Sequence, residues 1–137
     1  MSAFTRQVLI RFAHCDPAGL IFYPRFFGLV NEMAEDWFAA LGHSFKALHE
    51  NARKGVPTAD ISGEFMSPAR MGDVLTQSLT VHRLGAASCT LHHHAALGEK
   101  TVARFKQVLV FVDLDTMRPE PWPDVLRDAM SAYVEDT

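Results

Sequence analysis

The sequence has few cysteines and no long apolar run, and each absence excludes a class of protein. Its 137 residues include two cysteines, Cys15 and Cys89, whose spacing fits neither a disulfide framework nor a zinc site. No apolar stretch approaches the ~20 residues that span a bilayer. The N-terminal residues contain no apolar signal segment. We therefore expect a soluble protein of the reducing cytoplasm.

The sequence also lacks any run of basic residues. The formal net charge is -3 at pH 7, and the pI is about 6.1. A nucleic-acid-binding protein normally carries a basic face, and anionic lipid attracts clusters of Lys and Arg. We therefore expect no nucleic-acid partner and no membrane partner.

No low-complexity stretch, internal repeat or linker divides the chain. A length of 137 residues fits a single domain, residues 1–137. With 48% hydrophobic residues, including 10 phenylalanines, the chain can bury a substantial core. A domain of this size still leaves apolar surface uncovered, which favours association into oligomers.

Hydrophobic periodicity predicts five strands. Segment 7–12 alternates apolar and polar residues, as a half-buried strand does. Four more strands are expected at residues 56–66, 75–81, 89–97 and 101–112. Short Gly turns between the later strands indicate antiparallel neighbours. The last strand ends in an apolar run at 108–112, which is typical of a central strand. Short helices are expected after Ser44 and around Leu126, Met130 and Tyr133.

One long helix is predicted between Pro24 and Gly42, because proline suits the first helical turn and glycine is a natural stop. Its apolar residues recur at helical spacing, so we expect it to be largely buried: Val30, Met33, Ala34, Trp37, Phe38 and Leu41. An antiparallel sheet that curves around one such helix is an α+β fold. The helix covers only one face of that sheet, so packing against a second copy is expected.

The loop before this helix carries a carboxylate, Asp16. The first turn of a helix leaves backbone N–H groups unpaired, and these favour negative charge nearby. A carbonyl placed there would be polarised, and the oxyanion formed on attack would be stabilised. Asp16 would then attack the carbonyl or deprotonate a water. The alternative interpretation is structural, because an Asp that precedes Pro17 is common turn chemistry.

Two motifs give the chain a resemblance to a known family. Segment 14–24, His-Cys-Asp-Pro-Ala-Gly-Leu-Ile-Phe-Tyr-Pro, resembles the active-site segment of the 4-hydroxybenzoyl-CoA thioesterase family. Segment 65–73, Phe-Met-Ser-Pro-Ala-Arg-Met-Gly-Asp, is similar to the strand-to-turn segment of the same hotdog proteins. The resemblance implies a hotdog fold and an acyl-CoA thioesterase acting on an aromatic, benzoyl-like, or short acyl group. It also implies a homo-oligomer, a dimer or dimer of dimers, that needs no metal and no cofactor.

The resemblance implies roles for individual residues. Asp16 matches the family's catalytic aspartate, a nucleophile or general base, and Gly19 belongs to the same turn. Tyr23 matches the residue whose backbone N–H points at the thioester oxygen. The acyl pocket lies between two protomers, with the nucleotide near the surface. We expect the remaining substrate-binding residues to be Phe22, Asn31, Pro57, Arg83 and Ser88.

Two positions depart from the family's pattern. Turn 84–88 has no basic residue where the family enzyme meets the nucleotide phosphates, although Arg83 precedes it and Ser88 can hydrogen-bond. The chain has Asn31 where the family enzyme has an acid, and an amide cannot accept a proton. The sequence therefore does not single out 4-hydroxybenzoyl as the acyl group. Other cations that could meet the phosphates are Arg25, Arg53, Lys54 and Arg70.

Two histidine-containing segments were considered as metal sites. In a strand, His92 and His94 share one face and His93 points the other way, with no carboxylate or Cys beside them in sequence. Segment 14–16 mixes three ligand types, but consecutive residues rarely converge on one ion. We therefore expect no metal ligands.

Other interpretations of the same fold stay open. An acyl-carrier-protein thioesterase or a short-chain housekeeping thioesterase would fit the weakly basic turn 84–88. A non-catalytic module that binds acyl groups would not need Asp16. Some hotdog thioesterases place the catalytic carboxylate on the central helix, where this chain has Glu32, Glu35 and Asp36; a solvated polar face explains these equally well.

Overall fold

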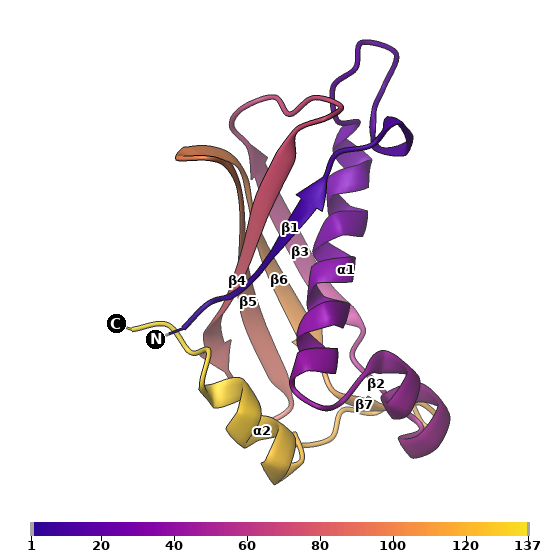
Figure 1. Ribbon diagram of the computed structural model, residues 1–137. Helices are drawn as coiled ribbons and strands as arrows, with labels where there is room; N and C mark the ends of the chain where they lie inside the picture. Colours follow the sequence, from indigo (N-terminus) through magenta and orange to yellow (C-terminus); the bar gives the residue numbers. More distant parts are fainter. Residues whose placement is uncertain (1, 137) are drawn as a thin grey trace.

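A computed structural model describes residues 2–136, in which one sheet and one long helix form the body of the molecule (Figure 1). The sheet has five antiparallel strands in the order β1-β4-β5-β6-β3. Their bounds are Phe4–Leu9 (β1), Thr58–Phe65 (β3), Val74–Leu84 (β4), Ser88–Leu97 (β5) and Lys100–Val110 (β6). A separate two-stranded pair joins β2, Lys54–Gly55, to β7, Val112–Asp113.

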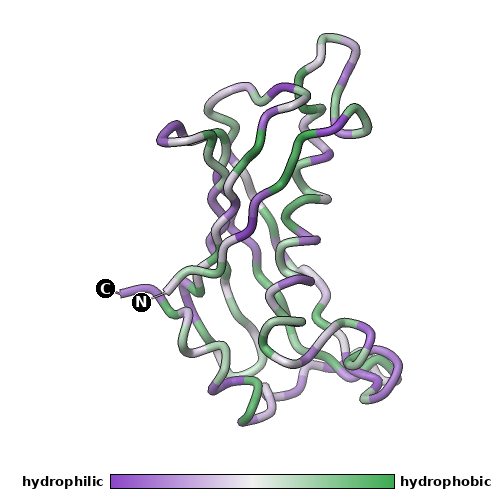
Figure 2. The backbone as a smooth tube through the Cα atoms, viewed as in Figure 1, coloured by the Kyte–Doolittle hydropathy of each residue, from purple (hydrophilic) through white to green (hydrophobic). Residues whose placement is uncertain are grey.

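The long helix α1, Tyr23–Ala40, lies along one face of the sheet, and α2, Asp124–Ser131, lies near the C-terminus (Figure 1). A 3₁₀ turn at Phe12–His14 and a π-helix at Ala47–Ala52 complete the helical segments. Figure 2 shows hydrophobic and hydrophilic residues alternating along α1, as the helical period requires. The stripe that α1 buries consists of Phe26, Leu29, Val30, Met33, Ala34, Trp37 and Phe38.

A row of polar side chains divides the core between α1 and the sheet into two apolar clusters. One cluster surrounds Trp37 and Phe38, and the other surrounds Phe26 and Phe105. The row consists of one buried polar residue on each of β4, β5 and β6: Gln77, His93 and Gln107. Along its strand, each has a residue of one cluster on one side and a residue of the other cluster on the other side. Each makes at least one hydrogen bond, as most buried polar side chains do.

The predicted α+β architecture, a curved antiparallel sheet wrapped around one long helix, is confirmed. The predicted short helix capped by Ser44, whose hydroxyl accepts a bond from the Ala47 N–H, is also confirmed, and it ends in a π-helix at Ala47–Ala52. Two details of the prediction were wrong. The first strand ends at Leu9, so Phe12 lies in the 3₁₀ turn and is 80% exposed. The outer side of α1 is exposed, because its polar residues face away from the core: Asn31, Glu32, Glu35 and Asp36.

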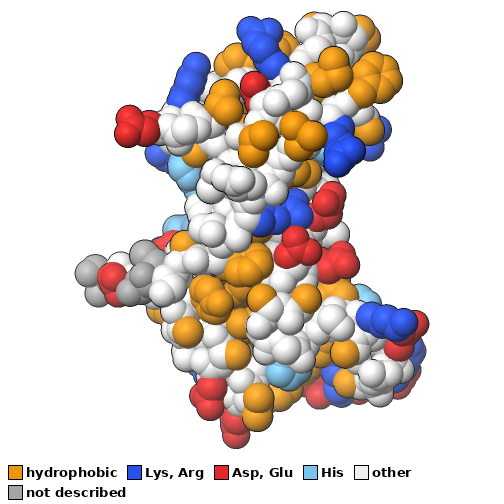
Figure 3. All heavy atoms as spheres, in the orientation of Figure 1, with side chains coloured by type: hydrophobic (Ala, Val, Ile, Leu, Met, Phe, Trp, Pro, Cys, Tyr) orange, Lys and Arg blue, Asp and Glu red, His pale blue; other side chains and the backbone are white. Residues whose placement is uncertain are grey.

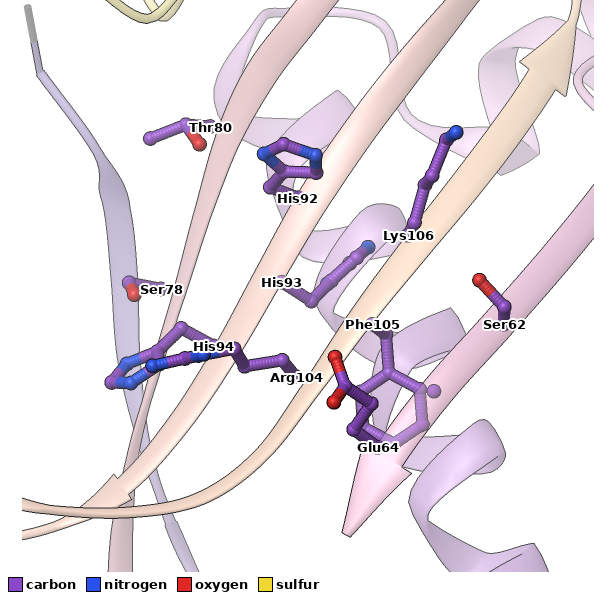
Figure 4. Close-up of a pocket in the computed structure, with 11 residues that line it drawn as sticks. Ser62, Glu64, Ser78, Thr80, His92, His93, His94, Arg104, Phe105 and Lys106 are labelled. Atoms are coloured by element: carbon purple, nitrogen blue, oxygen red, sulfur yellow. The ribbon is translucent and has the colours of Figure 1, made fainter. Parts of the chain in front are cut away.

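Two surfaces of the sheet lack a covering element. β3 forms one edge, and seven of its eight residues are exposed. The sheet face opposite α1 is polar and carries a groove of about 440 Å³, part of which Figure 4 shows. No helix in residues 2–136 is both long enough and apolar enough to cross a membrane.

Candidate active site

The loop before α1 folds back on itself as a short hairpin. The Asp16 N–H donates to the Leu20 carbonyl at 2.9 Å, and the Phe22 N–H donates to the His14 carbonyl at 2.9 Å. Between them, Cys15 and Ile21 form an antiparallel bridge. This pairing turns the chain tightly and brings Asp16 alongside the residues that lead into the helix.

Gly19 makes the tight turn possible. Its φ is +80°, a backbone conformation that residues with a Cβ rarely adopt. Its N–H donates to the Asp16 carbonyl at 2.9 Å, and its own carbonyl accepts from the Met71 N–H at 3.1 Å. The Asp-Pro-Ala-Gly sequence therefore folds locally as turn chemistry predicts.

The two oxygens of the Asp16 carboxylate have different surroundings. Oδ1 accepts hydrogen bonds from the backbone N–H groups of Ala18 at 2.9 Å and Leu20 at 3.3 Å. Oδ2 has no hydrogen-bond partner within residues 2–136. The structural and chemical interpretations of Asp16 are thus compatible, since one oxygen holds the turn and the other is left free.

The start of α1, which follows this hairpin in the chain, supplies a hydrogen-bond donor. Phe22 is the N-cap residue, with extended backbone angles and no side-chain cap, and Tyr23 is the first helical residue. Within residues 2–136, no acceptor is bonded to the Tyr23 backbone N–H. Pro24 follows and has no N–H to compete for an incoming acceptor. An unpaired N–H at the positive end of an 18-residue helix can polarise a carbonyl.

Segment 66–73 forms the other wall of the site. The Ile21 N–H donates to the Ala69 carbonyl at 2.9 Å, and Leu20 bridges to Arg70. A cavity of about 300 Å³ lies between this segment and the helix start. Its lining residues are Leu20, Ile21, Tyr23, Phe26, Phe65, Met66, Ser67, Pro68 and Ala69.

Aromatic rings gather at this cavity. Phe65, at the end of β3, lies 5.7 to 6.4 Å between ring centroids from each of its ring neighbours: Tyr23, Phe26, Phe27 and Phe105. Although it touches all four rings, Phe65 is 48% exposed. Figure 3 shows hydrophobic side chains gathered at the end of the molecule that carries this loop. The cavity is therefore apolar, aromatic and open.

Three predicted site residues belong to the hairpin, Asp16, Gly19 and Phe22, and Tyr23 follows it as the first residue of α1. The Phe22 and Tyr23 rings meet edge to face, with centroids 5.5 Å apart. Within one chain, Tyr23 lines the cavity and Asp16 does not. His14, the neighbour of Asp16 in the motif, accepts a bond from the Arg11 N–H through Nδ1 and so braces the 3₁₀ turn.

The other predicted site residues lie apart from Asp16 within one chain. Pro57 precedes β3, roughly 26 Å from Phe65 along an extended strand of eight steps. Arg83 and Ser88 flank the turn at the far end of β4, and Asn31 lies on the exposed face of α1. Their substrate-binding roles remain predictions.

Two residues of interest were missed from sequence. Phe65 was quoted only as part of a motif, although its position at the end of an apolar strand next to that motif was an available signal. Arg127, on α2, donates through its guanidinium to the carbonyls of Gly85 at 2.7 Å and Leu84 at 3.4 Å. Turn 84–88, which has no basic residue of its own, therefore receives a cation from a helix about 40 residues later in the chain, and no sequence pattern links the two.

Neither cysteine has the surroundings of a nucleophile. Burial raises the pKa of the Cys89 thiol to about 12, against a weaker opposing effect of its bond with Leu109. Cys15 is half-buried within the hairpin and pairs through its backbone. The Cys89 thiol therefore stays protonated at neutral pH, and a catalytic role for Asp16 stays a prediction.

A sheet curved around a helix, with a carboxylate and an unpaired N–H at the helix start, defines the class as hotdog thioesterase-like. Residues 10–130 match the family model described as the thioesterase-like superfamily, so the chain belongs to that superfamily. The predicted type of enzyme, a thioester hydrolase, is confirmed. The narrower resemblance to 4-hydroxybenzoyl-CoA thioesterases remains a prediction.

Individual relatives agree with this class. A 1,4-dihydroxy-2-naphthoyl-CoA hydrolase from Nostoc punctiforme is 25% identical over 122 residues, which cover 89% of this chain and 82% of the relative. The crystal structure of a 1,4-dihydroxy-2-naphthoyl-CoA thioesterase from Synechocystis superposes with a TM-score of 0.87 at 23% identity, covering 95% and 96% of the two chains. The structure of a gentisyl-coenzyme A thioesterase superposes with a TM-score of 0.85 at 21% identity, covering 93% of this chain and 99% of that one. At these identities the two structures establish the hotdog fold.

Proposed function

We propose that this protein hydrolyses the thioester of an aromatic acyl-CoA, with Asp16 as its catalytic carboxylate. Two observations carry the proposal: the hairpin before α1 leaves Asp16 Oδ2 without a partner, and the start of α1 leaves the Tyr23 N–H without an acceptor. The aromatic cavity beside Tyr23 supplies a place for the acyl group. Each part serves one step of acyl transfer to water.

The chemistry follows from these two groups. The thioester carbonyl oxygen accepts the Tyr23 N–H, and the helix dipole stabilises the negative charge that develops on that oxygen. Asp16 Oδ2 either attacks the carbonyl carbon to form a mixed anhydride or takes a proton from an attacking water. In both routes the C–S bond breaks, the CoA thiolate leaves, and water supplies the oxygen of the product acid.

The lining of the cavity supports an aromatic acyl group. Tyr23, Phe26 and Phe65 present rings to the space, and flat aromatic groups pack well against such rings. A volume of about 300 Å³ is at the lower end for small-molecule sites. Curated relatives named for a bicyclic aromatic thioester point the same way.

Two cations support CoA as the carrier. Arg83 precedes turn 84–88, and Arg127 reaches the same turn from α2. Guanidinium groups hydrogen-bond phosphate well, and this turn is where the resemblance expects the nucleotide. Exchange of Arg83 for Gln should raise KM for acyl-CoA and leave the KM of the matching acyl-pantetheine unchanged. If the wild type turns over acyl-CoA no better than the matching acyl-pantetheine, an acyl carrier protein becomes the better candidate for the acyl carrier.

A second copy of the chain would complete the site. β3 is an exposed edge strand without proline, and unpaired edges of this kind need a cover. Two-fold pairing of β3 with its own copy is antiparallel. That pairing would bring the second copy's Pro57 end beside this chain's Phe65 end. Light scattering should therefore give a dimer or a dimer of dimers, and a monomer at assay concentrations would contradict this part of the proposal.

A thiol-release screen tests the function directly. The panel contains naphthoyl-, benzoyl- and hydroxybenzoyl-CoA with short and long aliphatic acyl-CoAs, each also supplied as the acyl-pantetheine. We expect kcat/KM to be highest for an aromatic acyl group. Faster turnover of a short aliphatic thioester would overturn the aromatic assignment, and a protein inert to the whole panel would favour a non-catalytic acyl-binding module.

A further inference from the structure

A second cluster of reactive side chains lies on the sheet face that α1 does not cover. It brings together His82 of β4, His92 of β5 and Glu135, which follows α2. One nitrogen of each imidazole and one oxygen of the carboxylate all lie within 4.8 Å of one another. None of these residues belongs to the Asp16 site, which lies beyond the opposite end of β4 (Figure 1).

The backbone holds Glu135 in this position. The Val81 N–H donates to the Tyr133 carbonyl at 2.9 Å, and the Glu135 N–H donates to the Val81 carbonyl at 2.9 Å. Val134 and Val81 form a parallel bridge between them. The segment that follows α2 is therefore attached to β4 as a short extra strand, which places the Glu135 side chain over the polar face.

A bulge aims His82 at the same point. The pairing of β4 with β5 shifts between Val81 and Arg83, so His82 is the extra residue. Bulges re-aim side chains and recur next to functional sites. The His82 and His92 rings stack with centroids 4.3 Å apart and planes 22° from parallel.

The carboxylate sits between these two rings. His82 Nδ1 lies 3.0 Å from Glu135 Oε1, and His92 Nδ1 lies 2.7 Å from Glu135 Oε2. The Thr80 hydroxyl donates to Oε2 at 2.7 Å and fixes the orientation of the carboxylate. Figure 4 shows Thr80 and His92 side by side on neighbouring strands at the edge of the polar groove.

We propose that His82, His92 and Glu135 form a binding site for a divalent transition-metal ion, with Zn²⁺ as the best fit. Two imidazoles and one carboxylate are a ligand set that zinc uses in proteins, with an open fourth position for water. Thr80 acts as the outer group that orients a metal-bound carboxylate. No such site was predicted from the sequence, because His82 and Glu135 are 53 residues apart.

The side chains must shift slightly to surround an ion. Bonds of about 2.1 Å in a tetrahedral arrangement separate neighbouring ligand atoms by about 3.4 Å. The three candidate ligand atoms lie within 4.8 Å of one another, and each imidazole lies 3.0 or 2.7 Å from a different oxygen of Glu135. The side chains of His82 and His92 are about half exposed and can make that adjustment.

The carboxylate is in the form that binds a metal. A glutamate side chain is ionised at neutral pH, and Thr80, His82 and His92 all lie within hydrogen-bond distance of this one. A bound ion would join β4, β5 and the C-terminal segment at one point. We therefore expect the site to fasten that segment to the sheet rather than to take part in thioester hydrolysis.

The test is a Zn²⁺ titration of tag-free, chelator-stripped protein, by calorimetry and by competition with a chromogenic chelator. We expect one ion per chain and a rise in Tm on binding. Substitutions His82→Asn, His92→Asn and Glu135→Gln should each weaken binding by at least about tenfold. His94→Gln is the matched control, because His94 lies on the same face of the same strand and bonds Thr101 instead.

The outcomes separate this proposal from the thioesterase proposal. Binding that survives Glu135→Gln, or that His94→Gln removes equally, would overturn the site, as would the absence of stoichiometric binding. Bound Co²⁺ should show the intense visible absorption of a four-coordinate ion, and octahedral, aqueous-like bands would contradict the geometry. Thioester hydrolysis should be unchanged in Glu135→Gln, whether or not the metal binds.

Discussion

Acidification below neutral pH should destabilise the fold through one buried residue, His93. His93 is 4% exposed and lies in the polar row between the two core clusters. Its Nε2 meets Gln107 Oε1 at 2.9 Å, while the Gln107 amide nitrogen donates to Thr58. That orientation leaves the neutral ring with its proton on Nε2. His93 Nδ1 is then a buried acceptor with no partner within residues 2–136.

The magnitude follows from the pKa. Burial lowers the pKa of His93 from 6.5 to about 4, although the hydrogen bond with Gln107 opposes the shift. Because the unfolded chain binds the proton more readily, stability is fully present above pH 6.5 and is lost as the pH falls toward 4. The whole shift corresponds to about 3 kcal/mol. Between about pH 7.5 and pH 5, the free energy of unfolding should fall by about 2 kcal/mol.

That range lies above the titration of the two carboxylates whose pKa values are lowered in the fold, Asp113 and Glu135. Hydrogen bonds lower the pKa of Asp113 to about 2, the largest effect coming from Lys54 and smaller ones from the backbone of Asp115 and Thr116. The pKa of Glu135 is also about 2, from an ordinary value of 4.5. Both carboxylates therefore lose their stabilising effect below about pH 4.5, outside the window.

Urea denaturation at a series of pH values, at fixed protein concentration, measures the effect. The buried Trp37 and Trp122 report unfolding by fluorescence. His93→Gln keeps a donor for Gln107 without a titrating ring, so its free energy of unfolding should vary much less across the window. His94→Gln should keep the wild-type pH dependence. A flat wild-type profile, or an equal loss in His93→Gln, would refute the reasoning.

Two further predictions concern the packing around Phe65. A Cβ at Gly63 would lie 2.5 Å from two ring atoms of Phe105, so Gly63→Ala should lower the free energy of unfolding by about 1 to 3 kcal/mol in a urea titration; an unchanged midpoint would show that the ring moves aside freely. Phe65→Ala should raise KM for aromatic thioesters about three- to tenfold, from ring contacts of about 0.5 to 1.5 kcal/mol. Its KM for aliphatic thioesters should change little, and equal increases for both classes would contradict an aromatic role for the cavity.

The arrangement of elements could be predicted because each element carries its own pattern. The period of 3.6 residues in α1 and the alternation in β5 arise within single segments, so they can be read locally. The end of the first strand could not be predicted, since Phe12 continues the alternation that β1 begins. Hydrophobicity alone does not distinguish an apolar residue that packs inward from one that stays exposed at a turn.

In the candidate site, too, the residues that could be predicted are those close together in sequence. Asp16, Gly19, Phe22 and Tyr23 are neighbours in sequence, and one hairpin brings them together. Arg127 could not be assigned to turn 84–88, because its contact joins segments that only the fold places together. Clusters assembled across the sheet, such as the one around Glu135, escape a search for ligand spacing for the same reason.

The most direct test of the central claim is a comparison of kcat for the wild type and Asp16→Asn. The Asn oxygen can still accept the hydrogen bonds from Ala18 and Leu20, so the hairpin should persist while the free carboxylate oxygen is lost. We predict that kcat on the best aromatic acyl-CoA falls by about 10²- to 10⁴-fold, with Tm and substrate affinity close to those of the wild type. Turnover within about threefold of the wild type, measured on the folded variant, would contradict the assignment of Asp16 as the catalytic carboxylate.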